Sequence, residues 1–347
     1  MAARRAEVVV IGAGIMGSAT AWALARAGRE VVLLERFGVG HRRGSSHGAA
    51  RIFRLSYPQA RYVGMMQEAL PLWRELEDET GQTILTVTGG LDGGVGLERN
   101  EAAMEARAVP FEWIDGAEVA ARFPAMSGQR AERFLYQADG GIVRADVAWR
   151  AFVSAAAAHG AELREESTVV SIRPGDDAVE IDTEAGAYVA ATAVVTAGAW
   201  ARDLVAPAGF NLGVRATRET VAYFRLEQEV PTLLEWAGGF AYALPNPGEG
   251  LKAGEHGVGP EIDPDEEGGP NLDSVRRLGE WIRRRYPAAD PEPHRAETCL
   301  YTSTADESFV LDRRGRLIVG SPCSGHGFKF APLIGERLAA LALDALS

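Results

Sequence analysis

Residues 8–35 read VVVIGAGIMGSATAWALARAGREVVLLE, and this stretch decides the fold. The β-branched run at residues 7–11 predicts a short buried strand. The Ala-rich and Leu-rich run at residues 18–27 predicts a helix that Gly28 ends, because glycine is the usual residue just after a helix. Residues 31–34 predict a second buried strand. The chain therefore begins with a strand–helix–strand unit of the kind found in α/β domains.

The glycines between the first predicted strand and helix fit the pattern G-x-G-x-x-G. Gly12 permits a tight turn, Gly14 lets the backbone approach a pyrophosphate, and Gly17 lets the helix pack closely on the strand. Glu35 ends the second strand, where a carboxylate can accept hydrogen bonds from a ribose. The pattern predicts a dinucleotide site without choosing between NAD, NADP and FAD. Glu35 disfavours NADP, because it would repel the 2′-phosphate.

Composition narrows the class of protein. A chain of 347 residues can form two packed domains, and 46% hydrophobic and 24% charged residues are typical of a soluble protein. The net charge of −12 disfavours binding to nucleic acid or to an anionic membrane. Two cysteines do not suggest a disulfide framework, so we expect a cytoplasmic protein. The uncharged run at 8–25 is also compatible with an export signal or a membrane span, but its spaced glycines argue against both.

Further along the chain, two kinds of segment alternate. A predicted helix at 149–159, strands at 167–172, 193–196 and 317–319, and a helix at 333–346 resemble the first unit. By contrast, residues 85–139 mix strands with Gly-rich turns, and residues 213–301 alternate aromatic and polar residues as in an antiparallel sheet. Residues 257–270 predict an exposed loop. Two structural layers interleaved in sequence explain this order.

Four segments carry a family resemblance. They are the glycine fingerprint, GSSHGAARIFR at 44–54, GLKAGEH at 250–256 with IDPD at 262–265, and CLYT at 299–302 with SGHGFKF at 324–330. Each segment is unusual, and the four follow one another along the chain in the order that the family has. Residues 8–343 thus resemble the sarcosine oxidase group of the D-amino-acid-oxidase-like flavoprotein superfamily, which includes monomeric sarcosine oxidase and N-methyl-tryptophan oxidase.

The resemblance implies an α/β fold (α+β overall) in which two domains are interleaved in sequence. A Rossmann-like FAD-binding domain would comprise residues 1–84, 140–212 and 302–347. A substrate domain built on an antiparallel sheet would comprise residues 85–139 and 213–301. The resemblance also implies a monomer that carries FAD, attached covalently through Cys299. Cys323 has no counterpart in the family pattern.

The resemblance further implies roles for individual side chains. Arg54 and Lys329 match the pair that holds a substrate carboxylate, a role that suits a planar fork and a point charge. Lys252 matches the lysine that activates oxygen, where a fixed positive charge stabilises the developing negative charge. In an extended strand His256 would share a face with Lys252, while Glu255 would point away. The full set of expected catalytic or substrate-contacting residues is Arg54, Tyr242, Lys252, His256, Tyr301, Gly325 and Lys329.

The expected cofactor contacts come from separate parts of the chain, and no metal site is expected. They are Gly12, Gly14, Ile15, Met16, Gly17, Glu35, Arg36, Ser45, His47, Arg51, Val169, Gly198, Cys299, Gly325, Gly327 and Lys329. One position departs from the family pattern, because Ala50 stands where the family has a threonine whose hydroxyl helps to hold water near the activating lysine. This leaves open whether oxygen is the electron acceptor.

The implied activity is oxidation of the C–N bond of a small secondary amine or N-methyl amino acid to an imine, with O2 reduced to H2O2. Three alternatives remain open from the sequence. The first is an FAD-dependent dehydrogenase, or a biosynthetic oxidase that forms a cyclic imine from a bulkier amino acid. The second is an NAD-dependent dehydrogenase. The third is a flavin-binding protein without catalysis. The identity of the substrate is not specified by the sequence.

Overall fold

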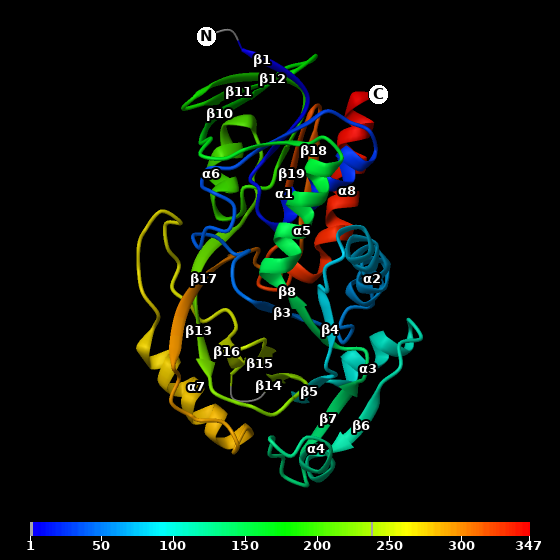
Figure 1. Ribbon diagram of the computed structural model, residues 1–347, viewed down its shortest axis with the longest axis vertical. Coiled ribbons are helices and arrows are strands. Elements are labelled where there is room, and N and C mark those ends of the chain that lie inside the picture. The colour runs from blue at the N-terminus through cyan, green and yellow to red at the C-terminus, as the bar shows by residue number, and fades with distance from the viewer. Residues whose placement is uncertain (1–2, 237–238) are drawn as a thin grey trace.

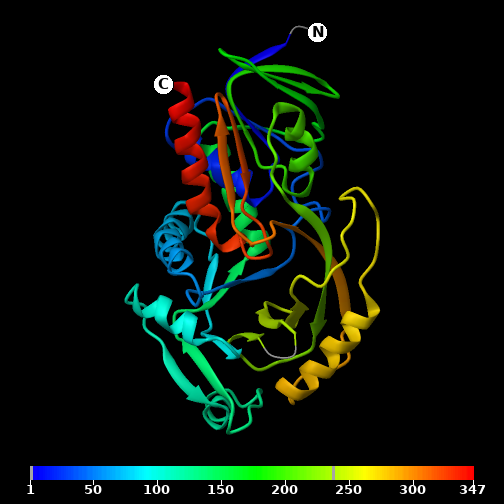
Figure 2. The ribbon, with the colours of Figure 1, turned by 180° about the vertical axis from the view of Figure 1, so that it is seen from behind.

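The computed structural model describes residues 3–236 and 239–347, which form two sheet layers stacked along the long axis of the molecule (Figure 1). The first and last elements, β1 (Arg4–Ile11) and α8 (Ala331–Leu346), both lie in the upper layer, as the view from behind also shows (Figure 2). Chain segments cross between the layers several times. This arrangement confirms the expected mixed α/β fold with two interleaved layers.

The upper layer contains five parallel strands in the order β19–β12–β1–β2–β9. An antiparallel strand, β18, extends one edge, and the hairpin β10–β11 pairs with the first half of β12. Helices α1, α5 and α8 cover one face together with α2, and the short α6 packs on the other. The bounds are β2 (Val31–Leu34), β9 (Glu162–Arg164), β10 (Val169–Pro174), β11 (Val179–Thr183), β12 (Gly186–Val195), β18 (Val310–Arg314), β19 (Leu317–Ser321), α1 (Ile15–Arg26), α2 (Ala60–Thr80), α5 (Ala145–Ala158) and α6 (Ala201–Val205).

The amino-terminal unit forms because both faces of β1 are buried. Val8 and Val10 pack against the helices, while Val9 and Ile11 pack in the cluster on the opposite face. A central parallel strand therefore has a continuous apolar run instead of an alternating one. The predicted helix at 18–27 begins three residues earlier, at Ile15, because the helix starts directly after the glycine turn. Gly28 ends it with a φ of 78°, as predicted.

The lower layer is a sheet of eight strands in the order β17–β13–β16–β15–β14–β5–β7–β6. Its neighbouring strands are antiparallel, as expected, except β14 and β5, which run parallel. The exception arises because β5 comes from the earlier piece of chain and joins the sheet without a hairpin. The bounds are β5 (Gly90–Gly94), β6 (Glu112–Asp115), β7 (Arg133–Gln137), β13 (Arg215–Phe224), β14 (Thr232–Trp236), β15 (Ala241–Asn246), β16 (Gly250–Glu255) and β17 (Arg295–Ser303).

Three helices accompany this sheet: α3 (Glu98–Glu105), α4 (Gly116–Arg122) and α7 (Leu272–Arg285). Leu278, Trp281 and Ile282 of α7 pack into the core cluster on one face of the sheet. Residues 257–270 contain no helix and no strand longer than a single bridge at Glu261, in agreement with the predicted loop.

A small antiparallel sheet of β3 (Ala50–Phe53), β8 (Gly141–Arg144) and β4 (Leu85–Val87) lies between the layers. We propose the two-domain division given above, with support from the separate membership of the two large sheets. Two elements do not respect its boundaries, because β4 pairs with β8 of the other domain and β17 runs past residue 301. Residues 1–2 and 237–238 of the proposed domains lie outside the described residues.

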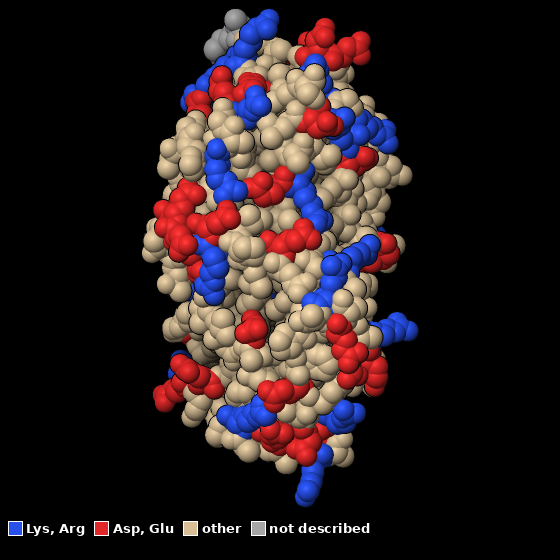
Figure 3. Space-filling model, turned by 90° about the vertical axis from the view of Figure 1, so that its right-hand side faces the viewer, with Lys and Arg blue, Asp and Glu red and all other residues tan. Residues whose placement is uncertain are grey.

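Neither the helices nor the surface face in Figure 3 has the features of a membrane-spanning or nucleic-acid-binding protein among the described residues. Within residues 3–236 and 239–347, no helix combines the length and apolar character that crossing a membrane requires. Figure 3 shows acidic and basic side chains interspersed over the face in view, without a continuous basic patch. This face offers no stripe of positive charge that would follow a nucleic-acid backbone.

Candidate active site

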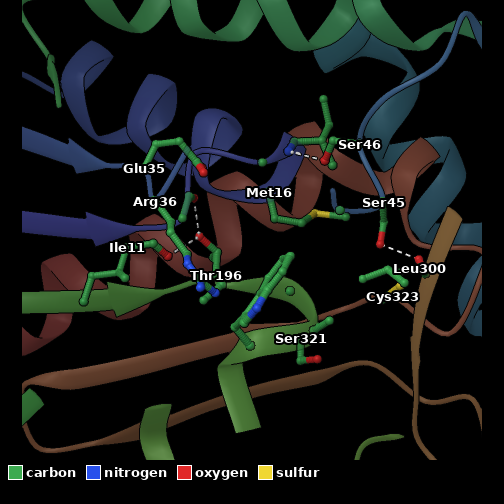
Figure 4. A pocket seen from close by; sticks show the side chains of 18 of the residues that line it. Ile11, Met16, Glu35, Arg36, Ser45, Ser46, Thr196, Leu300, Ser321 and Cys323 are labelled. Atoms are coloured by element: carbon green, nitrogen blue, oxygen red, sulfur yellow. Dashed lines mark hydrogen bonds between the residues drawn. The ribbon is translucent and has the colours of Figure 1, made fainter. Parts of the chain in front are cut away.

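A cavity of about 420 Å³ opens at the carboxyl ends of β1, β2 and β12 (Figure 4). In an open α/β sheet this edge is the usual place for a bound nucleotide. The cavity is lined by thirteen of the predicted cofactor contacts: Gly12, Gly14, Ile15, Met16, Glu35, Arg36, Ser45, Arg51, Val169, Gly198, Cys299, Gly325 and Gly327.

The turn between β1 and α1 has the geometry that a pyrophosphate site needs. Gly12 adopts a φ of 95°, which favours glycine, and its N–H donates to the Leu34 carbonyl at 2.8 Å. Ser46 Oγ accepts from the backbone N–H of Ile15 at 2.9 Å, at the first turn of α1. Ser46 belongs to the quoted segment 44–54 but was not among the predicted contacts. Its position marks the amide groups at the helix N-terminus that would face a phosphate.

Glu35 lies at the opposite side of this turn, at the end of β2. Its two carboxylate oxygens accept from the backbone N–H groups of Ala13 and Phe37 at 2.8 and 2.9 Å. Burial raises the pKa of Glu35, and the hydrogen bonds from Phe37 and Ala13 oppose that rise. Each oxygen has a second lone pair for a ribose hydroxyl, so the observed contacts are compatible with the proposed role.

Gly17 has a packing role and does not line the cavity. An added Cβ at this position would lie 1.8 Å from the carbonyl oxygen of Gly12, so helix and turn could not remain in place. We expect Gly17→Ala to weaken FAD binding at least tenfold, because overpacking of this kind costs about 1–3 kcal/mol. FAD content and a fluorescence titration of the apoprotein measure the effect.

The matched control for this prediction is Gly269→Ala, in an open part of the loop where an added Cβ meets no atom within 4 Å. That variant should bind FAD like the parent protein. Wild-type FAD affinity in Gly17→Ala would contradict the role assigned to the helix–turn contact.

A second cavity of about 230 Å³ adjoins the first. It is lined by all seven residues predicted to contact the substrate: Arg54, Tyr242, Lys252, His256, Tyr301, Gly325 and Lys329. The two cavities share Arg51, Cys299, Tyr301, Gly325 and Phe328. Residues that are up to 275 positions apart in the chain therefore meet in one place, as the resemblance implied.

The two predicted carboxylate-binding cations are both buried in the wall of this second cavity. Lys329 Nζ donates to the Tyr57 hydroxyl at 2.9 Å and to the His326 carbonyl at 2.8 Å. The Arg54 guanidinium lies 4.1 Å from the centre of the Tyr57 ring and donates to the Ser56 carbonyl. Burial, with a contribution from Arg54, lowers the pKa of Lys329 well below its usual value. An anion entering the cavity would relieve this concentration of positive charge.

Lys252 projects from β16 and is also buried. Its Nζ lies 3.5 Å from the carbonyl oxygen of Ala50 and 5.9 Å from the centre of the Tyr223 ring. Burial lowers the pKa of Lys252 to about 7, and the nearby Arg51 contributes to the shift. The family's threonine hydroxyl is absent at position 50, and here the backbone of that same residue contacts the lysine.

The predicted alternation along β16 is correct. Glu255 points away from the cavity, where Arg277 Nη2 donates to it at 2.6 Å. His256 follows the last residue of the strand and lines the cavity. Its Nε2 lies 3.3 Å from Glu307 Oε1. An added Cβ at Gly325 would lie 2.3 Å from the Tyr301 ring, so only glycine fits between these aromatic groups.

Both cysteines line the larger cavity. Burial raises the pKa of the Cys299 thiol, while Arg51 and Lys252 oppose that rise. Cys323, for which the resemblance implies no role, accepts from the backbone N–H of Thr302 at 3.4 Å. Cys299 differs from Cys323 in lining both cavities, which places it where they meet.

Besides Gly17, two predicted cofactor contacts do not line the first cavity. Lys329 lines the second cavity and not the first. His47 is buried but lines neither cavity, and its two ring nitrogens have no hydrogen-bond partner among the described residues. Burial lowers the pKa of His47 to about 4, and the positive charge of Arg51 is the second largest cause of this shift.

His47 should make the protein sensitive to acid. Its pKa in the folded protein lies below the unfolded value of about 6.5, so protons bind preferentially to the unfolded chain as the pH falls below 6.5. We expect this residue to lower the unfolding free energy by about 1.5 kcal/mol between pH 6.5 and 5. Urea unfolding at several pH values should show a shallower dependence in His47→Asn.

The exposed His294 provides the control for that measurement, as His294→Gln. It should leave the dependence of unfolding free energy on pH unchanged. An equal dependence in wild type and His47→Asn would show that His47 does not carry the effect.

The chain is similar to known proteins over nearly its whole length. The family model described as FAD dependent oxidoreductase matches residues 7–341. The chain belongs to the FAD-dependent oxidoreductase family. FAD is therefore the cofactor of the family to which the chain belongs, and the predicted cofactor and oxidoreductase class are confirmed.

Similar members of the family cover nearly the whole chain. Peroxisomal sarcosine oxidase of Homo sapiens is 35% identical, over 97% of this chain and 92% of that protein. Monomeric sarcosine oxidase of Bacillus sp. (strain B-0618) is 31% identical with the same coverage. The solved structure of NikD, described as an unusual amino acid oxidase essential for nikkomycin biosynthesis, is 29% identical and covers 98% of this chain and 94% of its own, with a TM-score of 0.90. These matches confirm the resemblance to the sarcosine oxidase group.

Several residues of the second cavity were not predicted. Trp236 and Phe240 stack with their ring centres 4.0 Å apart, and Tyr57, Glu307 and His326 are also among the lining residues. Tyr57 lies three positions after Arg54, and His326 lies within the quoted segment 324–330. The motif segments could therefore have pointed to these two residues. Trp236 and Phe240 carry no motif, and only sheet packing brings them to the cavity.

Proposed function

We propose that the chain oxidises the C–N bond of an N-methyl amino acid or small secondary amine to an imine and reduces O2 to H2O2. The observation that carries this proposal is the burial of Arg54 and Lys329 in one cavity that adjoins the FAD cavity at Cys299. Two cations, of which Lys329 lacks an acidic partner among the described residues, form a site for a single carboxylate. The names of the sarcosine oxidase relatives support the same class of substrate.

When bound, FAD supplies the two-electron acceptor for the amine and returns the electrons to oxygen. Arg54 and Lys329 hold the carboxylate, and this fixes which carbon of the substrate is presented. Gly325 and the rings of Tyr301 and Tyr242 bound the space left for the amine. Loss of two electrons and two protons converts the amine into an imine. Lys252 supplies positive charge for the reduction of oxygen.

The covalent attachment of FAD to Cys299 is part of this proposal. Its support is the position of Cys299 at the junction of the two cavities. The test is acid precipitation followed by mass spectrometry. The wild-type chain should retain a mass increment of one FAD, and Cys299→Ser should release the flavin while Cys323→Ser retains it.

A second candidate is oxidation of a bulkier amino acid, by an oxidase or a dehydrogenase. It is favoured by the cavity volume of about 230 Å³ and by the stacked pair Trp236 and Phe240 in its wall. Aromatic walls of this kind suit a large flat side chain or ring. Measurement of peroxide formed per turnover distinguishes the oxidase from the dehydrogenase.

Anaerobic bleaching of the bound flavin tests the function itself. A panel of sarcosine, larger N-methyl amino acids, proline and pipecolate should bleach the flavin with at least one member, and air should restore the colour with one H2O2 per cycle. Failure of every amine to bleach a flavin that dithionite reduces normally would reject the function. The name of the monomeric sarcosine oxidase relatives supports a monomer, and the two free cysteines support a cytoplasmic protein. Sedimentation analysis tests the proposed monomer.

A further inference from the structure

Asp92 is a buried carboxylate that lies behind the second cavity and does not line it. It sits in the middle of β5 with no exposed surface. Its Oδ1 is 3.7 Å from Arg54 Nη1 and accepts from Trp236 Nε1 at 3.4 Å. Its Oδ2 has no hydrogen-bond partner among the described residues. A carboxylate in such a place is costly unless an adjacent charge compensates it, and Arg54 is that charge.

The strand that holds Asp92 is unfavourable for it. Residues 90–94 read GLDGG, and both aspartate and glycine are depleted in strands. Local sequence preference therefore does not explain an acid in the centre of an eight-stranded sheet. Departures of this kind concentrate at functional sites.

The hydrogen bond and the ion pair of Arg54 with described residues both lie at one of the three guanidinium nitrogen atoms, Nη1. The one hydrogen bond of its guanidinium to a described residue runs from Nη1 to the Ser56 carbonyl, on the same side as Asp92. Ser56 is itself held, because its Oγ accepts from Asn100 Nδ2 at 2.8 Å. The Nε and Nη2 atoms make no hydrogen bond to a described residue. Those two atoms are the edge with which an arginine forms a bidentate pair with a carboxylate.

We propose that Asp92 is a positioning residue for substrate binding: from behind, it holds Nη1 of Arg54 so that the Nε–Nη2 edge faces the cavity. This inference rests on the proposed carboxylate site. It adds to that site a residue that never touches the substrate and that sets how well a carboxylate is recognised. Burial raises the pKa of Asp92 and the Arg54 charge opposes that rise, in agreement with a mutually dependent pair.

A simple countercharge would behave differently. If Asp92 only neutralised Arg54, then removing its charge would leave the guanidinium uncompensated, and a carboxylate ligand would bind more tightly. If Asp92 orients Arg54, the same change releases the guanidinium from its position, and a carboxylate binds less tightly. The direction of the change in affinity therefore separates the two roles.

The test measures equilibrium binding of acetate to the FAD-loaded protein, by perturbation of the flavin spectrum and by calorimetry, without turnover. We expect Asp92→Asn to weaken acetate binding about tenfold, which corresponds to about 1.4 kcal/mol. In an Arg54→Met background the same change should alter affinity less than twofold, because Asp92 acts only through Arg54. Asp92→Glu, which keeps the charge but displaces it, should also weaken binding and provides a second variant should Asp92→Asn fail to fold.

The control is Glu235→Gln, which removes another buried acid in the adjacent strand β14. Glu235 accepts from Trp281 and Arg285 and lines neither cavity, so acetate affinity should not change. Unchanged or tighter acetate binding in Asp92→Asn and Asp92→Glu, or equal losses with and without Arg54, would overturn the inference. If Arg54→Met alone bound acetate like wild type, the proposed carboxylate site itself would fail.

Discussion

Lys252→Met is expected to slow the reoxidation of reduced FAD by oxygen on the order of 10²–10³-fold, the usual effect of removing a preorganised charge from a reaction site. Lys252 is buried in the wall of the second cavity, and its one hydrogen bond to a described residue, the Ala50 carbonyl, is long at 3.5 Å, so its charge is available to a reacting molecule. Methionine keeps most of the volume and removes the charge. Stopped-flow mixing of the reduced enzyme with oxygen measures the rate.

The pH dependence gives this prediction a second readout. Burial lowers the pKa of Lys252 to about 7, so the charged form is lost as the pH rises through and above that value. Reoxidation of the wild-type enzyme should therefore slow as the pH rises, and the Met variant should lack that component. Reduction by the amine should change little. Equal reoxidation rates in the two proteins would reject the role of Lys252 and would favour the dehydrogenase alternative.

Arg54→Met is expected to weaken binding of an amino-acid substrate about 100-fold, because truncation of one partner of a buried hydrogen-bonded ion pair costs about 2–5 kcal/mol. The loss should appear mainly in the dissociation constant, since the carboxylate is far less involved in the electron transfer itself. The dependence of the anaerobic flavin-reduction rate on substrate concentration separates affinity from rate.

An arginine outside the cavity supplies the control for this prediction. Arg61 is exposed and donates to Ser308 at 2.9 Å, and it does not line the cavity. Arg61→Met should keep the wild-type dissociation constant. An amine without a carboxylate should bind wild type and Arg54→Met equally poorly. Unaltered affinity of Arg54→Met for an N-methyl amino acid would remove the main support for the proposed substrate class.

Local sequence patterns predicted some parts of the site and not others. The glycine turn was visible because Gly12, Gly14 and Gly17 act within a single strand–turn–helix, where spacing alone determines geometry. Arg54, Lys252 and Lys329 were visible only through the family resemblance, since none lies in a motif with local meaning. Asp92 carried no signal of either kind. His47 was predicted to contact the cofactor, and its burial outside both cavities is a feature of packing that the segment 44–54 does not reveal.

The sequence by itself determined the strand–helix–strand unit, because periodicity and glycine spacing are properties of neighbouring residues. It also determined the alternation of the two kinds of segment and the family, because both can be recognised from the order of segments along the chain. The tertiary structure decided which distant side chains meet. It placed Asp92 behind Arg54, joined Tyr57 to Lys329 across 272 positions, and paired β5 with β14 in parallel. Such contacts depend on sheet register and chain crossovers, which a one-residue shift would change without altering any local pattern.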